Sequence, residues 1–483
     1  MKFQTREEDH LFEATIKTDD FQLDGVRCKL YLPVKLADPI SLVFSPTVEQ
    51  ARILSDKLNW KFSFYGELNH GPDYITQVYA EKVYTHGLST KWVADVSESV
   101  LTAEPVDLQV DVLRPLDSPD LKEKIHGRFR LTPNELLTPA QTVLRSDTGN
   151  VSVETLRNIK FVLPNAIQLS FMNRYRFQKG EGGDTVSFHE LVAEFEAECK
   201  AGVAPDLKGE VLGLLEDLLR LASLAARQRC VCLEYDVVSE RGYTEYYRRD
   251  VTIPPLKAAG AAGRELVEQA DFEEFLYATY HKFIEMGRND LVRKAVDFAI
   301  PKEGQIFEGS FMSLYSALET LVLYFRRENN LEMVFSDDEE VWSQIKADLM
   351  LWLKNYPKLK DDKGKRALLY ENLPALTRIS FKTAFLKCCD FYSVDLHDLW
   401  PVLGNAEGWS LSTIRNKLVH GEYFNRQQLR ALISASEHLR WTVERLILSI
   451  LGWDTSRSNV SADMLSFRNQ YKYWEADRKL LSS

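Results

Sequence analysis

The sequence predicts an α+β protein in two parts, with a β-rich N-terminal half that contains some helices and an all-α helical bundle after it. Three observations predict this. Alternating apolar and polar residues recur in the first half, and apolar residues at helical spacing fill the second. Between them Pro254–Gly263 (PPLKAAGAAG) breaks both patterns. In this chain of 483 residues we expect domains over 1–255 and 264–455 and a helical extension over 456–483.

Segments with the alternating pattern of half-buried strands recur through the N-terminal half. The strongest hairpin signal is Cys230–Val238 and Tyr243–Ile253, joined by the turn-prone sequence SERG. The other expected strands are Phe12–Thr18, Val26–Leu32, Lys61–Tyr65, Leu108–Leu113 and Gly127–Leu131. Apolar spacing also predicts two helices in this half, over Phe188–Cys199 and Gly209–Arg227.

Apolar residues recur every three or four positions in the C-terminal half, as they do in amphipathic helices. The stripes are Phe272, Phe275, Leu276, Tyr280 and Phe283; Phe311, Leu314, Tyr315, Leu318, Leu321, Val322 and Phe325; Val341, Ile345, Leu349 and Trp352; and Leu429, Leu432, Ile433, Leu439, Val443, Leu446, Ile447 and Ile450. Ser310 is the expected N-cap of the second of these helices. Such a series predicts a helical bundle.

The composition is typical of a folded protein and excludes several classes. No run approaches the roughly 20 apolar residues that cross a bilayer, and the polar N-terminus lacks the apolar core of a signal peptide. We therefore expect a cytoplasmic protein that does not bind membranes. The net charge of −11 argues against coating nucleic acid by bulk charge, but it allows a local basic site.

The cysteines are spread along the chain without metal-ligand spacing. They are Cys28, Cys199, Cys230, Cys232, Cys388 and Cys389. No C-x-x-C pair occurs, so we expect structural thiols, no metal site and no cofactor. Phosphate-binding loops, dinucleotide-binding loops and the H-E-x-x-H motif are also absent from the sequence.

One segment, Trp409–Gly421 (WSLSTIRNKLVHG), carries the candidate chemistry. As a helix it would turn Leu411, Ile414 and Leu418 toward the core. Gly421 suits the left-handed position just after a helix. The helix is therefore expected to end at the residue before this glycine.

Three polar residues of this segment form the candidate site. Asn416 and His420 are four apart and would stack on the face away from the core. Arg415 would lie at the edge of the apolar stripe, about 140° around the helix from His420, so its side chain would have to reach around to share a ligand. The negative end of the helix dipole would favour a protonated imidazole at His420.

These residue types suit RNA cleavage without a metal. The reaction needs a base for the 2′-OH proton, an acid for the leaving 5′ oxygen, and a fixed cation beside the phosphorus. Arginine provides a permanent charge and a bidentate fork for phosphate. Arg415 and His420 of one chain cannot easily fill every role, so the chemistry implies a symmetric homodimer.

The motif RNKLVHG resembles the signature of HEPN domains, in which an Arg, a small polar residue and a downstream His form a ribonuclease centre. FMSLYSALETLVLYF, which spans residues 311–325, resembles an early HEPN helix whose acidic residue lies near that pair; Glu319 is the matching position. The resemblance covers about Phe272–Trp453. It implies a bundle that dimerises through its motif-bearing helices, with Arg415, Asn416, His420 and Glu319 at the site.

Together with the β-rich half, the whole chain resembles ApeA-type single-protein anti-phage effectors. That resemblance implies host RNA or tRNA as the substrate, growth arrest as the outcome, and an N-terminal half that senses a phage-derived trigger. One departure concerns HEPN proteins that an antitoxin silences by adenylylation, which carry a Tyr two residues after the His. Here Tyr423 follows His420 by three residues, which puts such modification in doubt.

A basic connection, Leu353–Arg366, is the second candidate RNA contact. The expected phosphate-binding residues are Lys358, Lys360, Lys363, Lys365 and Arg366, together with Lys417 of the motif. A solvated surface is the alternative for this connection. The aromatic and basic residues of Phe467–Lys479 suit either base stacking or packing on the bundle.

Each site residue also has a structural alternative. Arg415 and His420 could bond neighbours at a helix end, Asn416 could orient a neighbour, and Glu319 could form a surface ion pair. The rival to an enzyme is a non-catalytic HEPN module that binds RNA or a protein.

Overall fold

The structure of the chain is a computed structural model. It describes residues 10–32, 40–57, 61–69, 74–93, 96–114, 122–138, 141–145, 151–155, 159–164, 166–179, 185–200, 211–240, 242–249, 265–286, 291–302, 305–331, 339–404, 408–422, 424–426 and 428–482. The chain divides into a β-rich unit, formed by 1–222 and 229–258, and a helical unit, formed by 223–228 and 259–483. The predicted boundary Pro254–Gly263 lies outside the described residues.

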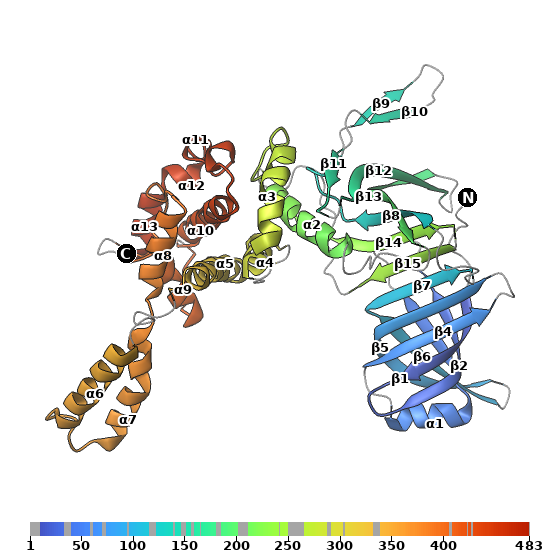
Figure 1. The fold of residues 1–483 in the computed structure, drawn as a ribbon, viewed down its shortest axis with the longest axis horizontal. Coiled ribbons are helices and arrows are strands. Elements are labelled where there is room, and N and C mark those ends of the chain that lie inside the picture. Colours follow the sequence, from blue (N-terminus) through green and yellow to red (C-terminus); the bar gives the residue numbers. More distant parts are fainter. Residues whose placement is uncertain are drawn as a thin grey trace. The chain divides into compact units, whose positions relative to one another are not determined.

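Six antiparallel strands of the β-rich unit close into a ring (Figure 1). They are β1 (His10–Lys17), β2 (Gln22–Tyr31), β3 (Ser41–Ser45), β4 (Lys61–Asn69), β5 (Ile75–Val93) and β6 (Val96–Pro105). The order β5-β4-β1-β2-β3-β6 is closed by pairing of β5 with β6. Helix α1 (Val48–Lys57) lies at one end of the ring (Figure 1).

The sheet continues beyond β5 as a second set of strands, in the order β7-β15-β14-β8-β13-β12-β11. Their bounds are β7 (Asp107–Leu113), β8 (Lys122–Leu131), β11 (Ile159–Val162), β12 (Gln168–Lys179), β13 (Thr185–Lys200), β14 (Cys232–Ser239) and β15 (Gly242–Arg248). β9 (Gln141–Arg145) and β10 (Val151–Thr155) form a separate hairpin. Helix α2 (Leu212–Ala226) follows β13.

Buried and exposed side chains alternate along the strands of the ring, and this alternation forms its core. In β2, Val26, Cys28 and Leu30 are buried, whereas the residues between them are exposed or half-buried. Phe44 on β3 packs edge-on against Phe62 and Phe64, whose ring centroids lie 5.8 and 5.7 Å away. Side chains from all these strands thus fill one apolar interior.

The prediction of a helix over Phe188–Cys199 is wrong, because this segment lies within strand β13. β13 pairs with β12 over residues 185–194 and with β8 over residues 191–200, so the whole segment lies in the sheet. Leu191, Ala193 and Phe195 are buried at two-residue spacing, with Val192 buried between the first two, and this period fits the same residues that suggested a helix. Pairing with two neighbouring strands overrides the local preference. The predicted helix over Gly209–Arg227 is confirmed as α2, and the named strands are confirmed with shifted ends.

The helical unit contains α3 to α13, as predicted for this half. Their bounds are α3 (Phe272–Met286), α4 (Leu291–Ala299), α5 (Phe307–Glu328), α6 (Glu339–Asn355), α7 (Lys363–Asn372), α8 (Phe381–Phe391), α9 (Leu411–Val419), α10 (Leu429–Leu451), α11 (Ala462–Leu465), α12 (Asn469–Lys472) and α13 (Trp474–Ser482), with 3-10 turns at Leu373–Thr377 and Thr455–Arg457. α5 packs on α4, α8, α9 and α10, and α10 also packs on α12 and α13.

The predicted apolar stripes of α3 and α5 are buried, but three details of the prediction are wrong. α5 begins one turn before Ser310, so Ile306 is its N-cap and no side chain caps it. On α10, Leu429 and Ile433 are exposed although Leu432 and Leu439 are buried. The stripe of α6 is helical, yet Val341 and Trp352 are exposed. In the described residues, no helix has both the length and the apolar character that crossing a bilayer requires.

Candidate functional site

The motif-bearing helix α9 is capped at both ends by its own residues. Ser410 is the N-cap, and its hydroxyl accepts a hydrogen bond from the backbone N–H of Thr413 at 3.1 Å. At the other end Gly421 has a φ of +72°. The N–H of Gly421 donates to the carbonyl of Leu418, and that of Glu422 donates to the carbonyl of Lys417. This is the Schellman pattern, which places His420 at the C-cap, as the glycine predicted.

Leu411 and Ile414 anchor α9 in the core, where both are fully buried. Leu418, which was expected to join them, is only half-buried. The opposite face is solvated, since Asn416 and His420 are both exposed. The helix therefore presents its polar face to solvent while one turn fixes it to the bundle.

Arg415 lies at the edge of that face and reaches back to α5. Its Nη2 lies 3.5 Å from Oε1 of Glu319, and its Nη1 donates to Oδ1 of Asn416 at 3.2 Å. The guanidinium carbon lies 5.6 Å from the ring centroid of Tyr315, a cation–π distance. The side chains of Arg415 and Glu319 are 31% and 45% exposed, so solvent reaches the pair. Arg415 is thus held from two sides and still open to a ligand.

Tyr315 is fixed beneath the guanidinium by a short chain of hydrogen bonds. The Ser412 hydroxyl donates to the carbonyl of Val402 at 2.6 Å, so the Tyr315 hydroxyl, 2.8 Å away, donates to Ser412. Burial raises the pKa of Tyr315, which keeps the phenol protonated at neutral pH and able to donate. The ring therefore holds one orientation below Arg415.

His420 is not joined to Arg415. Within the described part of the chain its imidazole makes no hydrogen bond or ion pair, and it is exposed. The nearest tyrosine in sequence, Tyr423, lies outside the described residues. No protein group described in this chain fixes the tautomer or the orientation of His420.

Lys417, a predicted RNA contact, is engaged by its neighbours. Its ammonium lies 4.4 Å from the ring centroid of Trp409 and pairs with the carboxylate of Glu422. An RNA phosphate would therefore compete with an aromatic ring and a carboxylate for this charge.

The other predicted RNA contacts lie on α7 and on the connection between α6 and α7. Lys358, Lys360 and Lys363 are exposed, and their side-chain ammonium groups make no hydrogen bond or ion pair to the residues that the structure describes. Lys365 pairs with Asp362 at 3.1 Å. Arg366 is half-buried, and its guanidinium donates to the carbonyls of Leu359 and Lys360. It therefore stabilises the connection between α6 and α7.

The structure thus brings together Arg415, Asn416 and Glu319, and leaves His420 and the α6–α7 lysines without a bond to them. It adds Tyr315, which the sequence analysis assigned to the apolar stripe alone. A signal was present: Tyr315 and Glu319 are four residues apart, which places both on one side of α5.

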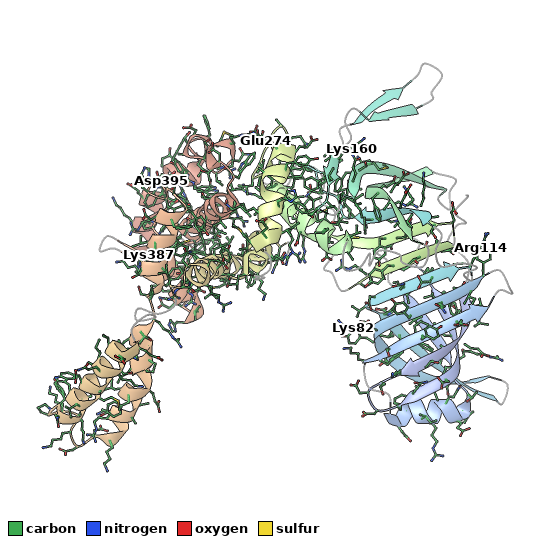
Figure 2. All side chains as sticks on the ribbon, viewed as in Figure 1. Lys82, Arg114, Lys160, Glu274, Lys387 and Asp395 are labelled. Atoms are coloured by element: carbon green, nitrogen blue, oxygen red, sulfur yellow. The ribbon has the colours of Figure 1, made fainter. Side chains whose placement is uncertain are left out.

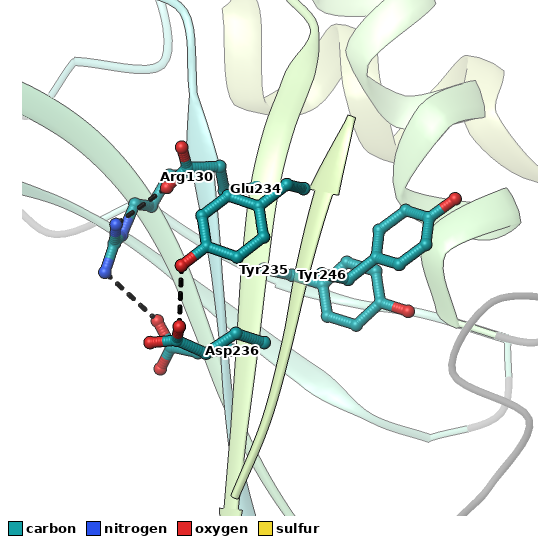
Figure 3. Close-up of a pocket in the computed structure, with 7 residues that line it drawn as sticks. Arg130, Glu234, Tyr235, Asp236 and Tyr246 are labelled. Atoms are coloured by element: carbon teal, nitrogen blue, oxygen red, sulfur yellow. Dashed lines mark hydrogen bonds and ion pairs between the residues drawn. The ribbon is translucent and has the colours of Figure 1, made fainter. Parts of the chain in front are cut away.

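The β-rich unit holds two further clusters. In the first, buried ion pairs join Arg130 to Glu234 at 2.8 Å and to Asp236 at 3.5 Å, beside Tyr235 and Tyr246 (Figure 3). These side chains fill the pocket and leave no room for a water molecule. The cluster therefore links β8, β14 and β15 and does not form a ligand site.

The second cluster is an open groove of about 610 Å³ at one end of β8, β13 and β14. His126 lies in it, 3.7 Å from Glu196 and 4.0 Å from Glu194. Across the residues that are described in either unit, no group of three or more His, Cys, Asp or Glu side chains could hold a metal ion.

Comparison of the chain with protein-family models, with curated proteins and with solved structures finds no match in any of the three.

Proposed function

We propose that this protein is a metal-independent endoribonuclease of the HEPN type, with Arg415 and His420 as its catalytic pair. The observation that carries the proposal is the environment of Arg415 on the RNKLVHG helix. Its guanidinium is held by Glu319 and Tyr315 at a solvent-accessible surface, five residues before the exposed His420. A cation fixed in this way is preorganised for a phosphate, because little side-chain freedom remains to be lost on binding.

In the proposed reaction a histidine removes the proton of a ribose 2′-OH, and the 2′ oxygen attacks the adjacent phosphorus. The bond from phosphorus to the 5′ oxygen breaks, and a second acid protonates that oxygen. The products carry a 2′,3′-cyclic phosphate and a 5′-OH. Arg415 neutralises the charge that develops on the phosphate oxygens. His420 of a second chain supplies the second proton-transfer group, so the active form is a homodimer.

Host RNA or tRNA is the proposed substrate, and growth arrest of a phage-infected cell is the proposed outcome. The protein would act in the cytoplasm, with the β-rich unit sensing a phage-derived trigger. These points follow from the resemblance to ApeA-type effectors. Lys417 and the lysines on α6–α7 are the proposed additional phosphate contacts, and Lys358, Lys360 and Lys363 have the least competition from neighbouring carboxylates.

The test compares wild-type protein with His420→Ala and Arg415→Ala on total RNA and purified tRNA, with EDTA present. We expect the wild type to cleave and each variant to lose roughly 100-fold or more in rate. His281→Ala, at an exposed histidine on α3, is the matched control and retains full activity. Toxicity of the expressed gene, relieved by the first two substitutions only, gives the same answer in cells.

One observation favours the alternative of a non-catalytic HEPN module. In the part of the chain that is described, no side chain orients the His420 imidazole, whereas a general base normally has such a partner. A module that binds RNA or protein through Arg415 needs no oriented base. Equal and intact RNA in all samples, with RNA binding that Arg415→Ala weakens, would support this alternative.

A further inference from the structure

The hairpin of α6 and α7 consists of amphipathic helices that bury almost nothing. The structure describes both helices completely; Leu353 is the one buried side chain of α6, and α7 has none. Large apolar side chains are exposed along the hairpin and just after it, with exposed fractions that reach 59% at Leu351 and 61% at Leu368. They are Val341, Met350, Leu351, Trp352, Tyr356, Leu368, Leu369 and Leu376. Figure 2 shows side chains extending from all sides of this hairpin.

Such a hairpin is poorly stabilised by its own contacts. α6 has 17 residues and α7 has 10, and single helices of this length are marginal in water. α6 packs mainly on α7, and α7 on the 3-10 turn that follows it. In soluble proteins the apolar face of a helix is normally covered by another element. These exposed apolar side chains are therefore available for contact with a further surface.

Charge along the hairpin indicates what that surface is. The basic end, formed by the connection and the residues beside it, carries the exposed Lys354, Lys358, Lys360, Lys363 and Lys365, with Asp361 and Asp362 among them. The acidic end, where α6 begins and α7 finishes, carries the exposed Glu339, Glu340 and Glu371. A surface with opposite charges at its two ends is complementary to itself when one copy is turned end to end.

We propose that the α6–α7 hairpins of two chains pack antiparallel about a twofold axis to form a four-helix bundle. The apolar side chains form its interior, and the acidic end of each hairpin faces the basic end of its partner. The inference goes beyond the proposed function and does not rest on it. Antiparallel packing keeps the two motif-bearing helices at opposite ends of the bundle, roughly the 25 Å length of α6 apart. This interface is therefore separate from the one at which two Arg415–His420 pairs would meet.

RNA is the competing occupant of the hairpin, because five lysines and two exposed aromatic rings suit a single strand. Six of the eight exposed apolar residues are not aromatic, however, and phosphates or bases cover such side chains poorly. The acidic end would also repel RNA. The observations therefore favour a second copy of this chain. In that arrangement the partner's acidic end takes the place of the RNA phosphates proposed above for Lys358, Lys360 and Lys363.

The first test measures the mass of the full chain by light scattering over a range of concentrations. We expect wild type at twice the 55.6 kDa of one chain or at a larger multiple of it. Trp352→Glu with Leu369→Glu buries unpaired charge in the interface, and we expect dissociation to become roughly 100-fold easier. Phe467→Glu, at an exposed aromatic residue outside the hairpin, is the control and keeps the mass of wild type. A monomeric wild type, or a double variant with the same mass as wild type at every concentration, overturns the inference.

The second test reverses charge without altering the apolar residues, so that it holds even where the first variant misfolds. Chains with Glu339→Lys and Glu340→Lys, and chains with Lys358→Glu and Lys360→Glu, should each dimerise more weakly. An equal mixture of the two should form heterodimers, because each altered end then meets an opposite charge. No recovery on mixing, with RNA binding lost in the second variant alone, would assign the hairpin to RNA and overturn the inference.

Mass and cleavage are measured on the same samples, which separates the two proposals. If self-association depends on the hairpin but the protein never cleaves RNA, the nuclease proposal is wrong and the interface proposal stands. If the protein cleaves RNA and its mass is unchanged by every hairpin substitution, the interface proposal is wrong and the nuclease proposal stands.

Discussion

Nη2 of Arg415 on α9 lies 3.5 Å from Oε1 of Glu319 on α5, and this contact connects two helices that are 96 residues apart in the chain. The pair is partly open to solvent, so it contributes little to folding stability. Its effect is to limit where the guanidinium can go. Stability and activity should therefore respond very differently when it is removed.

Glu319→Gln should leave the free energy of unfolding within about 1 kcal/mol of wild type, because an exposed ion pair is weak. RNA cleavage should fall roughly tenfold or more, since Arg415 then loses the carboxylate that positions it. Thermal unfolding and initial cleavage rates measure the two effects. Glu308→Gln, at another exposed glutamate of α5, is the matched control. If Glu319→Gln cleaves RNA as fast as Glu308→Gln, Glu319 does not position Arg415 for the reaction.

Gly421→Ala tests the end of α9. A Cβ at this position would meet no atom within 4 Å, so the cost comes from the backbone φ of +72° alone. We expect a loss of about 1 kcal/mol in unfolding free energy, together with slower cleavage because His420 is the adjacent C-cap. Gly364→Ala lies in α7 without a positive φ and should cost nothing. Urea unfolding that shows the same change for both glycines would contradict this prediction.

His438 on α10 should make the helical unit sensitive to acid. Its Nδ1 accepts the N–H of Trp400 at 3.0 Å, and Nε2 lies 3.1 Å from the carbonyl of Gln470. Burial lowers the pKa of His438 to about 4 from an ordinary value of 6.5. The unfolded chain therefore binds a proton first, and stability that is complete above pH 6.5 is lost as the pH falls toward 4.

This loss amounts to about 3 kcal/mol by linkage. Unfolding by urea at several pH values between 7 and 4 measures it. In His438→Gln, which keeps a donor and an acceptor but cannot take up the proton, the unfolding free energy should fall less steeply with acid. Parallel pH profiles for the two proteins would show that another group is responsible.

Gly127→Ala tests the close approach of β8 and β13. Gly127 pairs with Phe195, and a Cβ on the glycine would lie 2.0 Å from the phenyl ring. Since that ring is buried and stacks on Phe129, we expect a loss of about 1–3 kcal/mol. Phe195→Leu in the Gly127→Ala protein should recover part of it, whereas in the wild-type background it should be destabilising. Additive effects in this double-mutant cycle would contradict the contact.

The sequence predicted most elements of the fold because strands and helices bury their residues with different periods. It failed at Phe188–Cys199, where pairing with β12 and β8 decides the structure and local spacing does not. It also failed at Val341 and Trp352, which are apolar at helical spacing and yet exposed. Periodicity identifies an apolar face but does not identify the surface that covers it.

The candidate site was predictable to a similar extent. The local end of α9 followed from Ser410 and Gly421, whose capping chemistry acts within a few residues. The position of the Arg415 side chain above Tyr315 could not be predicted in this way. Tyr315 lies 100 positions upstream, and its spacing on α5 indicates only a core residue. Contacts of that sequence separation depend on how α5 and α9 pack, which no short motif encodes.

The end of α2 limits how the chain can be dissected. Residues 223–228 belong with the helical unit, although they precede β14 and β15 in the chain. Within that unit Arg227 forms a buried ion pair with Glu444 of α10, with Nε 2.7 Å from Oε1. A fragment cloned from residue 259 onward would lose residues 223–228 and leave the Glu444 carboxylate without the ion-pair partner it has in the whole chain. A fragment that begins after the predicted boundary at Pro254–Gly263 would therefore have a less stable helical unit. Lack of RNA cleavage by that fragment would say nothing about the catalytic residues.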